Sequence, residues 1–281
     1  MPKVKKMKTA RAKSGVSLTE MTVVVAAVAL LASLSTPTIR TFFDSLASRD
    51  DTRAMISASL SAARAIAAKE QRYAGIRFQK AYHPQGPLYG QQYMIFIVHD
   101  PEATTLANGF RTVEGIKPKK LPEGIGVMDL RHRTNLSSAS DPQDDFTDLD
   151  IEIDEPYELT DTTAFSIIFS PSGKMVIHYV RVWNRDGAPR WPLLLDNSND
   201  DVFNTIARIT DILNPAGMFV QDDYAGDGLG QELSRSSFVI YDRAEFGGVN
   251  VNSRWTDYLA RLVSEMIYIN AYTGRIISSD Q

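Results

Sequence analysis

Cysteine is absent from the 281 residues of this chain. Its absence excludes disulfide bridges, Cys-ligated zinc sites, iron–sulfur clusters and thiol catalysis. The sequence also contains no H-E-x-x-H motif and no G-x-S-x-G motif. Its four histidines are scattered along the chain, at His83, His99, His132 and His178. We therefore interpret each histidine as a surface or packing residue, expect no cofactor and no metal, and predict that the chain is not an enzyme.

Acidic side chains are missing from the first fifteen residues, which carry six basic ones. These six are Lys3, Lys5, Lys6, Lys8, Arg11 and Lys13. The remainder of the chain holds 24 basic and 34 acidic residues, which gives it a net charge of -10. Because an acidic body does not suit a polyanion, we predict no nucleic-acid partner.

Charge of either sign is absent from residues 21–39, which are mostly apolar. Extending this run back to Val16 adds a single charge, that of Glu20. Twenty-four helical residues span about 36 Å, enough to cross a hydrocarbon core of about 30 Å. We therefore predict a membrane helix over residues 16–39, with the basic head in the cytoplasm and the body on the opposite side.

Three kinds of N-terminal segment fit this pattern in part. A plain membrane anchor accounts for the length and the charges. A secretory signal peptide accounts for the basic head and offers Ala27-Val28-Ala29 as a cleavage site. Neither accounts for Glu20, because a carboxylate in an apolar helix costs about 2.5–3.5 kcal/mol on insertion scales.

The third interpretation rests on the hexapeptide from Gly15 to Glu20, Gly-Val-Ser-Leu-Thr-Glu. It resembles the type III signal of type IV prepilins and type II secretion pseudopilins, in which a basic leader ends in glycine. In that family the glutamate lies five residues past the glycine and a proline lies twenty-two past it, as Glu20 and Pro37 do here. Val16 departs from the pattern, since the family usually has phenylalanine there.

The resemblance implies a processing step and an assembly step. A prepilin peptidase would cut after Gly15 and methylate the new amine on Val16, leaving residues 1–15 as a cytoplasmic leader. The positive amine could then pair with the Glu20 carboxylate of a neighbouring subunit, and Pro37 would kink or end the helix. The implied partners are other pilin or pseudopilin subunits, the peptidase, the inner-membrane assembly platform and a secreted substrate. The implied location is the bacterial inner membrane, and the filament after assembly.

An amphipathic pattern follows over residues 40–75. Ile56, Leu60, Ala63 and Ala67 recur at helical spacing, with charged residues between them. Gly75 is a candidate stop signal. We therefore expect one long helix over residues 17–74, whose second half packs on a globular head formed by residues 76–281.

The head alternates strand-like runs with turns. Residues 93–98 and 238–241 read as strands, and residues 165–169 and 175–180 flank a turn at residues 170–174. Residues 266–270 and 275–277 read as a C-terminal hairpin. Two helical patterns interrupt them, one built on Val202, Ile206, Ile209 and Leu213 and the other on Trp255, Tyr258, Leu259, Leu262 and Met266, with Asn252 or Ser253 as its N-cap.

These patterns predict an α+β, pilin-like fold: a long N-terminal helix packed on a mainly antiparallel sheet. The sequences of the two predicted hairpins, FSPSGKMV and INAYTGRII, also resemble the H-type minor pseudopilin. We expect a structural subunit of a type II secretion pseudopilus or a type IV pilus. A membrane-tethered adhesin or substrate receptor is the alternative. Calcium bound at Asp196, Asp200 and Asp201, or at Asp222, Asp223 and Asp227, is a weaker alternative to solvated acidic loops.

Overall fold

The computed structural model describes residues 49–130, 152–153, 156–184, 202–222 and 231–277. All of them lie within one compact unit, residues 48–281, which is separate from the residues before it. The described residues form a mixed α+β structure with a mainly antiparallel, curled sheet. The coarse fold class predicted from the sequence is therefore confirmed.

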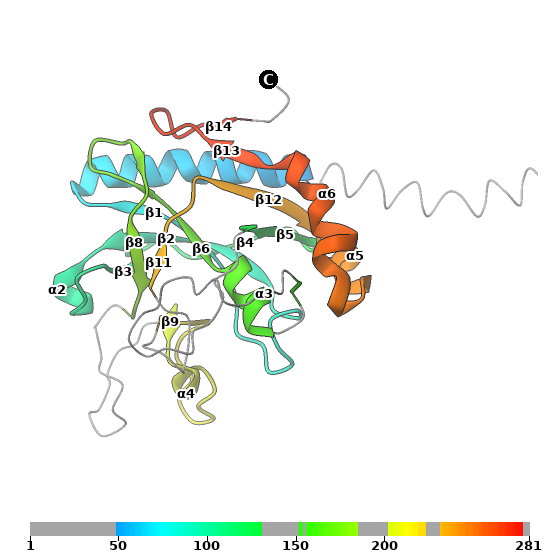
Figure 1. The fold of residues 1–281 in the computed structure, drawn as a ribbon. Helices are drawn as coiled ribbons and strands as arrows, with labels where there is room; N and C mark the ends of the chain where they lie inside the picture. Colours follow the sequence, from blue (N-terminus) through cyan, green and yellow to red (C-terminus); the bar gives the residue numbers. More distant parts are fainter. Residues whose placement is uncertain (1–48, 131–151, 154–155, 185–201, 223–230, 278–281) are drawn as a thin grey trace, which may run out of the picture. The chain divides into compact units, whose positions relative to one another are not determined.

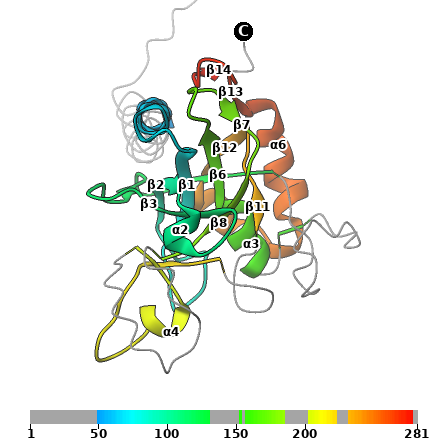
Figure 2. The ribbon, with the colours of Figure 1, turned by 90° about the vertical axis from the view of Figure 1, so that its left-hand side faces the viewer.

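The first described element is a helix over residues 49–70, which we call the long helix. It lies along the sheet beside β1 (Ala74–Lys80), as Figures 1 and 2 show from two directions. The helix ends at Glu70, earlier than expected, and Gln71 takes a left-handed backbone conformation with φ of 54°. Gly75 is not the stop signal, because it lies inside β1, where a Cβ would meet the carbonyl oxygen of Ile167.

The main sheet has eight strands. They are β1, β2 (Gln92–His99), β3 (Gly109–Thr112), β4 (Lys119–Lys120), β6 (Phe165–Phe169), β7 (Met175–Val176), β8 (Tyr179–Val182) and β11 (Glu232–Leu233). Their order is β11-β8-β3-β2-β1-β6-β7, with β4 paired to β2. All pairs are antiparallel except β3 with β8. The parallel pair places β8 beside β3, and β11 then extends the sheet beyond β8.

The remaining described strands form two smaller sheets. The order β14-β13-β12-β5 describes an antiparallel sheet of β5 (Ile125–Met128), β12 (Ser237–Asp242), β13 (Ile267–Ile269) and β14 (Ile276–Ile277). The strands β9 (Phe203–Asn204) and β10 (Phe219–Val220) form a parallel pair. The β6–β7 and β13–β14 hairpins were both predicted and are confirmed, although the second strand of the first breaks after Val176 and resumes as β8.

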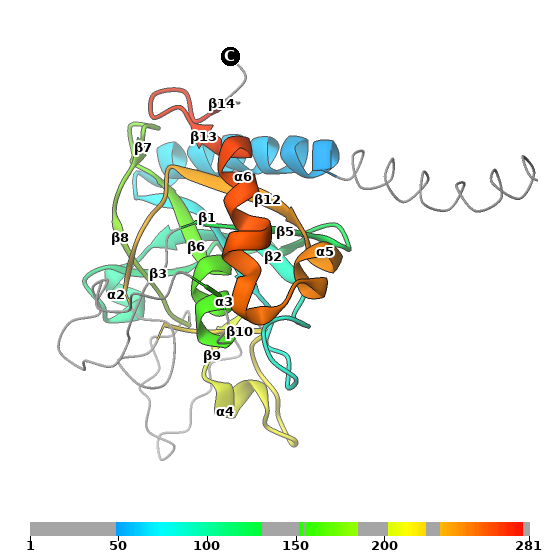
Figure 3. The same ribbon diagram turned by 45° about the vertical axis from the view of Figure 1, so that its right-hand side comes forward.

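Short helices cover the remaining surfaces. They are α2 (Pro101–Thr104), α3 (Pro156–Thr163), α4 (Ile206–Ile209), α5 (Arg243–Gly248), η1 (Val251–Ser253), η2 (Trp255–Leu259), α6 (Ala260–Leu262) and η3 (Val263–Glu265). The last four run on from one another, which confirms the helical pattern that starts near Trp255. Figure 3 shows α3 and α6 on one side of the molecule. Asn250, rather than Asn252 or Ser253, provides the first side-chain cap, and Glu152 accepts the backbone N–H groups of Trp255 and Thr256.

The helix predicted on Val202, Ile206, Ile209 and Leu213 is confirmed only in its middle part and is wrong at both ends. Only α4 is α-helical there, and the chain before it pairs as β9. Thr205 caps α4, and the Asp211 carboxylate accepts the N–H groups of Leu213 and Asn214, which turns the chain out of the helix. Leu213 is 95% exposed, so the apolar pattern meets no packing surface that would hold a longer helix.

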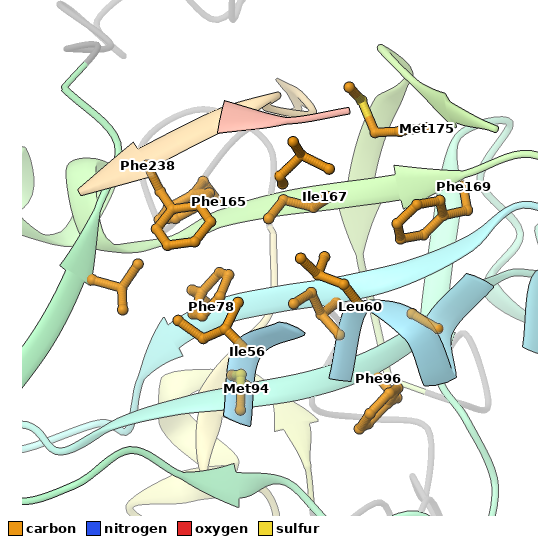
Figure 4. Close-up of a cluster of buried hydrophobic side chains, with 14 of the residues drawn as sticks. Ile56, Leu60, Phe78, Met94, Phe96, Phe165, Ile167, Phe169, Met175 and Phe238 are labelled. Carbon is orange, nitrogen blue, oxygen red and sulfur yellow. The ribbon is translucent and has the colours of Figure 1, made fainter. Parts of the chain in front are cut away.

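The largest hydrophobic core lies between the long helix and the main sheet. Ile56 and Leu60 from the helix meet Phe78, Phe165 and Ile167 from the sheet, as Figure 4 shows. All five side chains are fully buried. Further cores lie on the opposite face of the main sheet and between β12 and the helices that follow it.

Candidate functional site

The residues that the sequence singles out for processing and assembly are Gly15, Val16, Glu20 and Pro37. All four lie outside the described residues, as do the expected leader, residues 1–15, and the expected membrane helix, residues 16–39. Within the part of the chain that the structure describes, no helix is both long and apolar enough to span a bilayer. The candidate assembly element that can be described is the long helix.

The long helix has two faces of different composition. Its inner stripe contains Ile56, Leu60, Ala63 and Ala67, each of which is completely buried. This stripe was predicted from helical spacing and is confirmed. The outer face carries alanines at positions 54, 58, 62 and 65, all exposed. Small side chains let another helix approach closely, so this face places no steric obstacle in the way of helix packing.

A buried ionic network lies on the sheet face opposite the long helix. Arg77, in the middle of β1, is completely buried and donates to Glu232 at 2.6 Å and to Asp222 at 3.1 Å. Its Nε atom donates to Gln79 at 2.6 Å, and Ser166 also donates to Glu232 at 2.9 Å. Two carboxylates thus share one guanidinium in the interior of the protein, and each of them forms an ion pair with it.

The network fixes late segments of the chain onto the sheet. Asp222 and Glu232 come from either side of residues 223–230, and both contact Arg77. The second Asp222 oxygen accepts the backbone N–H of Val182 at 2.7 Å, and the Gln79 amide donates to the carbonyl of Val220 at 2.7 Å. Asp222, which had been considered as a calcium ligand, is therefore engaged by Arg77 and by backbone. Its other proposed partners, Asp223 and Asp227, lie outside the described residues.

Two histidines that are far apart in the sequence lie together in the structure. The ring centroids of His99 and His178 are 5.6 Å apart, and Tyr73 and Phe110 each contact both rings. Both histidines are partly exposed. Although they are scattered in the sequence, His99 and His178 thus lie in one aromatic cluster with Tyr73 and Phe110.

Charged groups flank this histidine pair. Asp100 forms ion pairs with Arg111 at 2.7 Å and Arg72 at 3.1 Å, and it also caps α2. Burial acts to raise the pKa of Asp100, but hydrogen bonds from Arg111 and from the backbone of Ala103 outweigh it and hold the pKa below its ordinary value. Burial lowers the pKa of His99, which favours its neutral form.

A third polar cluster surrounds Lys80 at the end of β1. Its ammonium donates to the carbonyl of Pro87 at 2.8 Å, and Arg243 donates to the carbonyls of Leu88 and Gly90. Burial, followed by the nearby charges of Arg243 and Arg254, lowers the pKa of Lys80 to about 7. Tyr241 is buried close to the same arginines, and burial raises its pKa to a value above the normal range. The cluster holds the connection between β1 and β2 in place.

The described histidines all form hydrogen bonds through a ring nitrogen. The ring nitrogens of His83, His99 and His178 all bond backbone atoms. Among the described residues, no group of three or more His, Cys, Asp or Glu side chains is arranged to hold a metal ion. The sequence did not predict the Arg77 network or the histidine pair. The local sign of the network is an arginine placed between the apolar residues Ile76 and Phe78.

Comparisons with known proteins give no relative for this chain. No family model, no curated protein and no solved structure matches it.

Proposed function

We propose that this chain is a structural subunit of a type II secretion pseudopilus or a type IV pilus. The observation that carries the proposal is the long helix, which lies along an antiparallel sheet with its apolar stripe buried. In the sequence this helix follows the apolar segment and the residues that resemble a prepilin signal. A subunit held in a filament through its N-terminal segment needs a head attached firmly to that segment. The buried side chains of Ile56 and Leu60 attach the long helix, which continues the chain from that segment, to the sheet of the head.

In this proposal the peptidase cuts after Gly15 and methylates Val16. Methylation leaves the amine positive, so it can still pair with Glu20 of a neighbouring subunit. The attraction is strong in a low dielectric, although desolvation offsets part of it. The remaining 266 residues form the mature subunit in the inner membrane, which the assembly platform draws into the filament.

The first test is processing of the full chain in a bacterium that supplies a prepilin peptidase. Mass spectrometry of the wild-type protein should show a mature N-terminus at a methylated Val16. The Gly15→Ala variant should keep its leader and its methionine start, while the adjacent Ser14→Ala variant should be cut normally. Normal maturation of Gly15→Ala, or a wild-type terminus near Ser33, would overturn the proposal.

A membrane-tethered binding module is the second candidate, and one feature of the head favours it. Residues 206–218 form an ordered tip that displays Ile212 and Leu213, which are 96% and 95% exposed. Exposed aliphatic pairs of this kind suit contact with another protein. A Glu20→Ala variant separates the candidates in the same cells: a subunit loses its place in sheared filaments but stays in the membrane, whereas a tethered module is unaffected. Thr19→Ala is the matched control.

A further inference from the structure

We propose that His99 and His178 chelate a divalent transition-metal ion, of the kind that imidazole ligands favour: Zn²⁺, Ni²⁺ or Cu²⁺. His99 is the last residue of β2, and His178 lies in the connection between β7 and β8. The proposal is independent of the pilin assignment, because it rests only on the geometry of these two side chains.

The hydrogen bonds of the two rings fix which nitrogen of each carries the proton. Nε2 of His99 lies 3.0 Å from the carbonyl oxygen of Ala107, and Nδ1 of His178 bonds the carbonyl oxygen of Tyr179. A carbonyl oxygen only accepts, so each of these nitrogens must be the donor. In the neutral rings the lone pairs are then on Nδ1 of His99 and Nε2 of His178.

This arrangement is the one that metal-bound histidines adopt. A ligating imidazole almost always donates its other N–H to a carbonyl, a carboxylate or water, which fixes the tautomer and the orientation of the ring. Both histidines make such a bond to the backbone. Little rearrangement of protons is therefore needed for binding.

The separation of the rings also fits a shared ion. With metal–nitrogen bonds of about 2.0–2.1 Å, each ring centroid lies about 3.2 Å from the metal, and a tetrahedral angle puts the two centroids about 5.2 Å apart. The observed separation of 5.6 Å is close to this value. Tyr73, whose centroid is 4.4 Å from that of His178, and Phe110, at 5.1 Å from that of His99, restrain the rings.

Among the described residues, the two histidines are the ligands that this site offers. The Asp100 carboxylate forms ion pairs with Arg72 and Arg111, so we do not count it as a metal ligand. Its negative charge offsets the positive charges of these two arginines near the site. Both histidines are partly exposed, which leaves water to complete the coordination sphere. We therefore expect an open site that takes up one ion per chain.

The test uses the full chain in detergent, purified without a histidine tag and titrated with ZnCl₂ by calorimetry. One Zn²⁺ should bind, and His99→Gln and His178→Gln should each weaken binding at least about tenfold. His83→Gln is the matched control, since His83 lies apart from the pair and contacts Tyr89; its binding should be unchanged. Binding that survives both substitutions, or no binding by the wild type, would overturn the proposal.

Two spectroscopic measurements on the wild type keep the proposal testable if the variants fold poorly. Nitrogen-15 spectra of the metal-free protein should show His99 protonated on Nε2 and His178 protonated on Nδ1. Electron paramagnetic resonance of the Cu²⁺-loaded chain should show two coordinated imidazole nitrogens. The opposite tautomers, or a copper spectrum with fewer than two nitrogens, would refute chelation by this pair.

Discussion

The two faces of strand β1 bury different chemistry. Ile76 and Phe78 point into the apolar core under the long helix, whereas Arg77 and Gln79 point to the opposite face and join the ionic network. All of these residues are buried. One strand therefore carries a dry hydrophobic contact on one side and a paired set of charges on the other.

The difference follows from what covers each face. The long helix arrives directly before β1 in the sequence, and its apolar stripe matches the apolar side of the sheet. The opposite face is covered by segments that come much later, including the residues around Asp222 and Glu232. These segments bring charge into the interior, where its pairing must be complete. The comparison indicates that the helix contact is a general hydrophobic attachment, whereas the other face depends on one specific set of partners.

Removing the guanidinium should therefore produce the largest effect. Arg77→Met leaves two buried carboxylates without their cation, so we expect a loss of about 3–5 kcal/mol in the free energy of unfolding. Urea denaturation of residues 48–281, which form a compact unit, provides the measurement.

The control for this variant is Arg275→Met, an exposed arginine whose loss should change stability by less than about 0.5 kcal/mol. A triple variant that combines Arg77→Met with Asp222→Asn and Glu232→Gln should recover part of the loss, because no unpaired charge stays buried. An Arg77→Met protein as stable as the control would show that the network is not what holds this face.

The helix side should respond more simply. Leu60→Ala removes a completely buried side chain between the long helix and the sheet, and we expect a loss of about 2–5 kcal/mol. The loss comes from transfer and cavity terms and should not depend on pH. Ser61 follows Leu60 in the helix but is exposed, so Ser61→Ala is the matched control. Its free energy of unfolding should lie within about 0.5 kcal/mol of that of the wild type. Equal stability of the Leu60 and Ser61 variants would contradict the assignment of the inner stripe.

The same contrast explains what the sequence could predict. The inner stripe of the long helix was found from helical spacing, and the β6 strand from a run of aromatic and β-branched residues beside a turn. The partners of Arg77 are 145 and 155 residues away, so no local spacing encodes their meeting. The histidine pair was missed for the same reason.

At residues 202–213 the local pattern misled in the other direction: it predicted a longer helix than the structure contains. Its spacing was helical, but the Thr205 cap, the Asp211 turn and the pairing of β9 with β10 decide the local structure. An apolar period without a surface to pack on does not make a long helix. The prepilin-type residues Gly15, Val16, Glu20 and Pro37 remain predictions, because they lie outside the described residues.

Lys80 differs from Arg77 in its charged neighbours. It is a buried basic residue, and the nearby charges of Arg243 and Arg254 are also positive. Its pKa is lowered from 10.5 to about 7 in the folded protein, so the unfolded chain binds this proton more tightly between these values. Raising the pH through that range should therefore stabilise the fold, by about 1 kcal/mol per pH unit from this group.

The Lys80→Met variant isolates the pH dependence of stability that comes from Lys80. Relative to the variant, the wild type should gain stability as the pH rises from 7 towards 10, and the two should run parallel below pH 6, where Lys80 is charged in both the folded and the unfolded chain. The variant also loses the hydrogen bond to Pro87 at every pH, so the quantity that decides is the change of the stability difference with pH and not its size at one pH. Lys69→Met, at an exposed lysine, is the matched control. A constant difference between wild type and Lys80→Met across pH 6–10 would mean that Lys80 stays charged in the fold, and that its burial among arginines is compensated by the carbonyl groups that it and Arg243 bind.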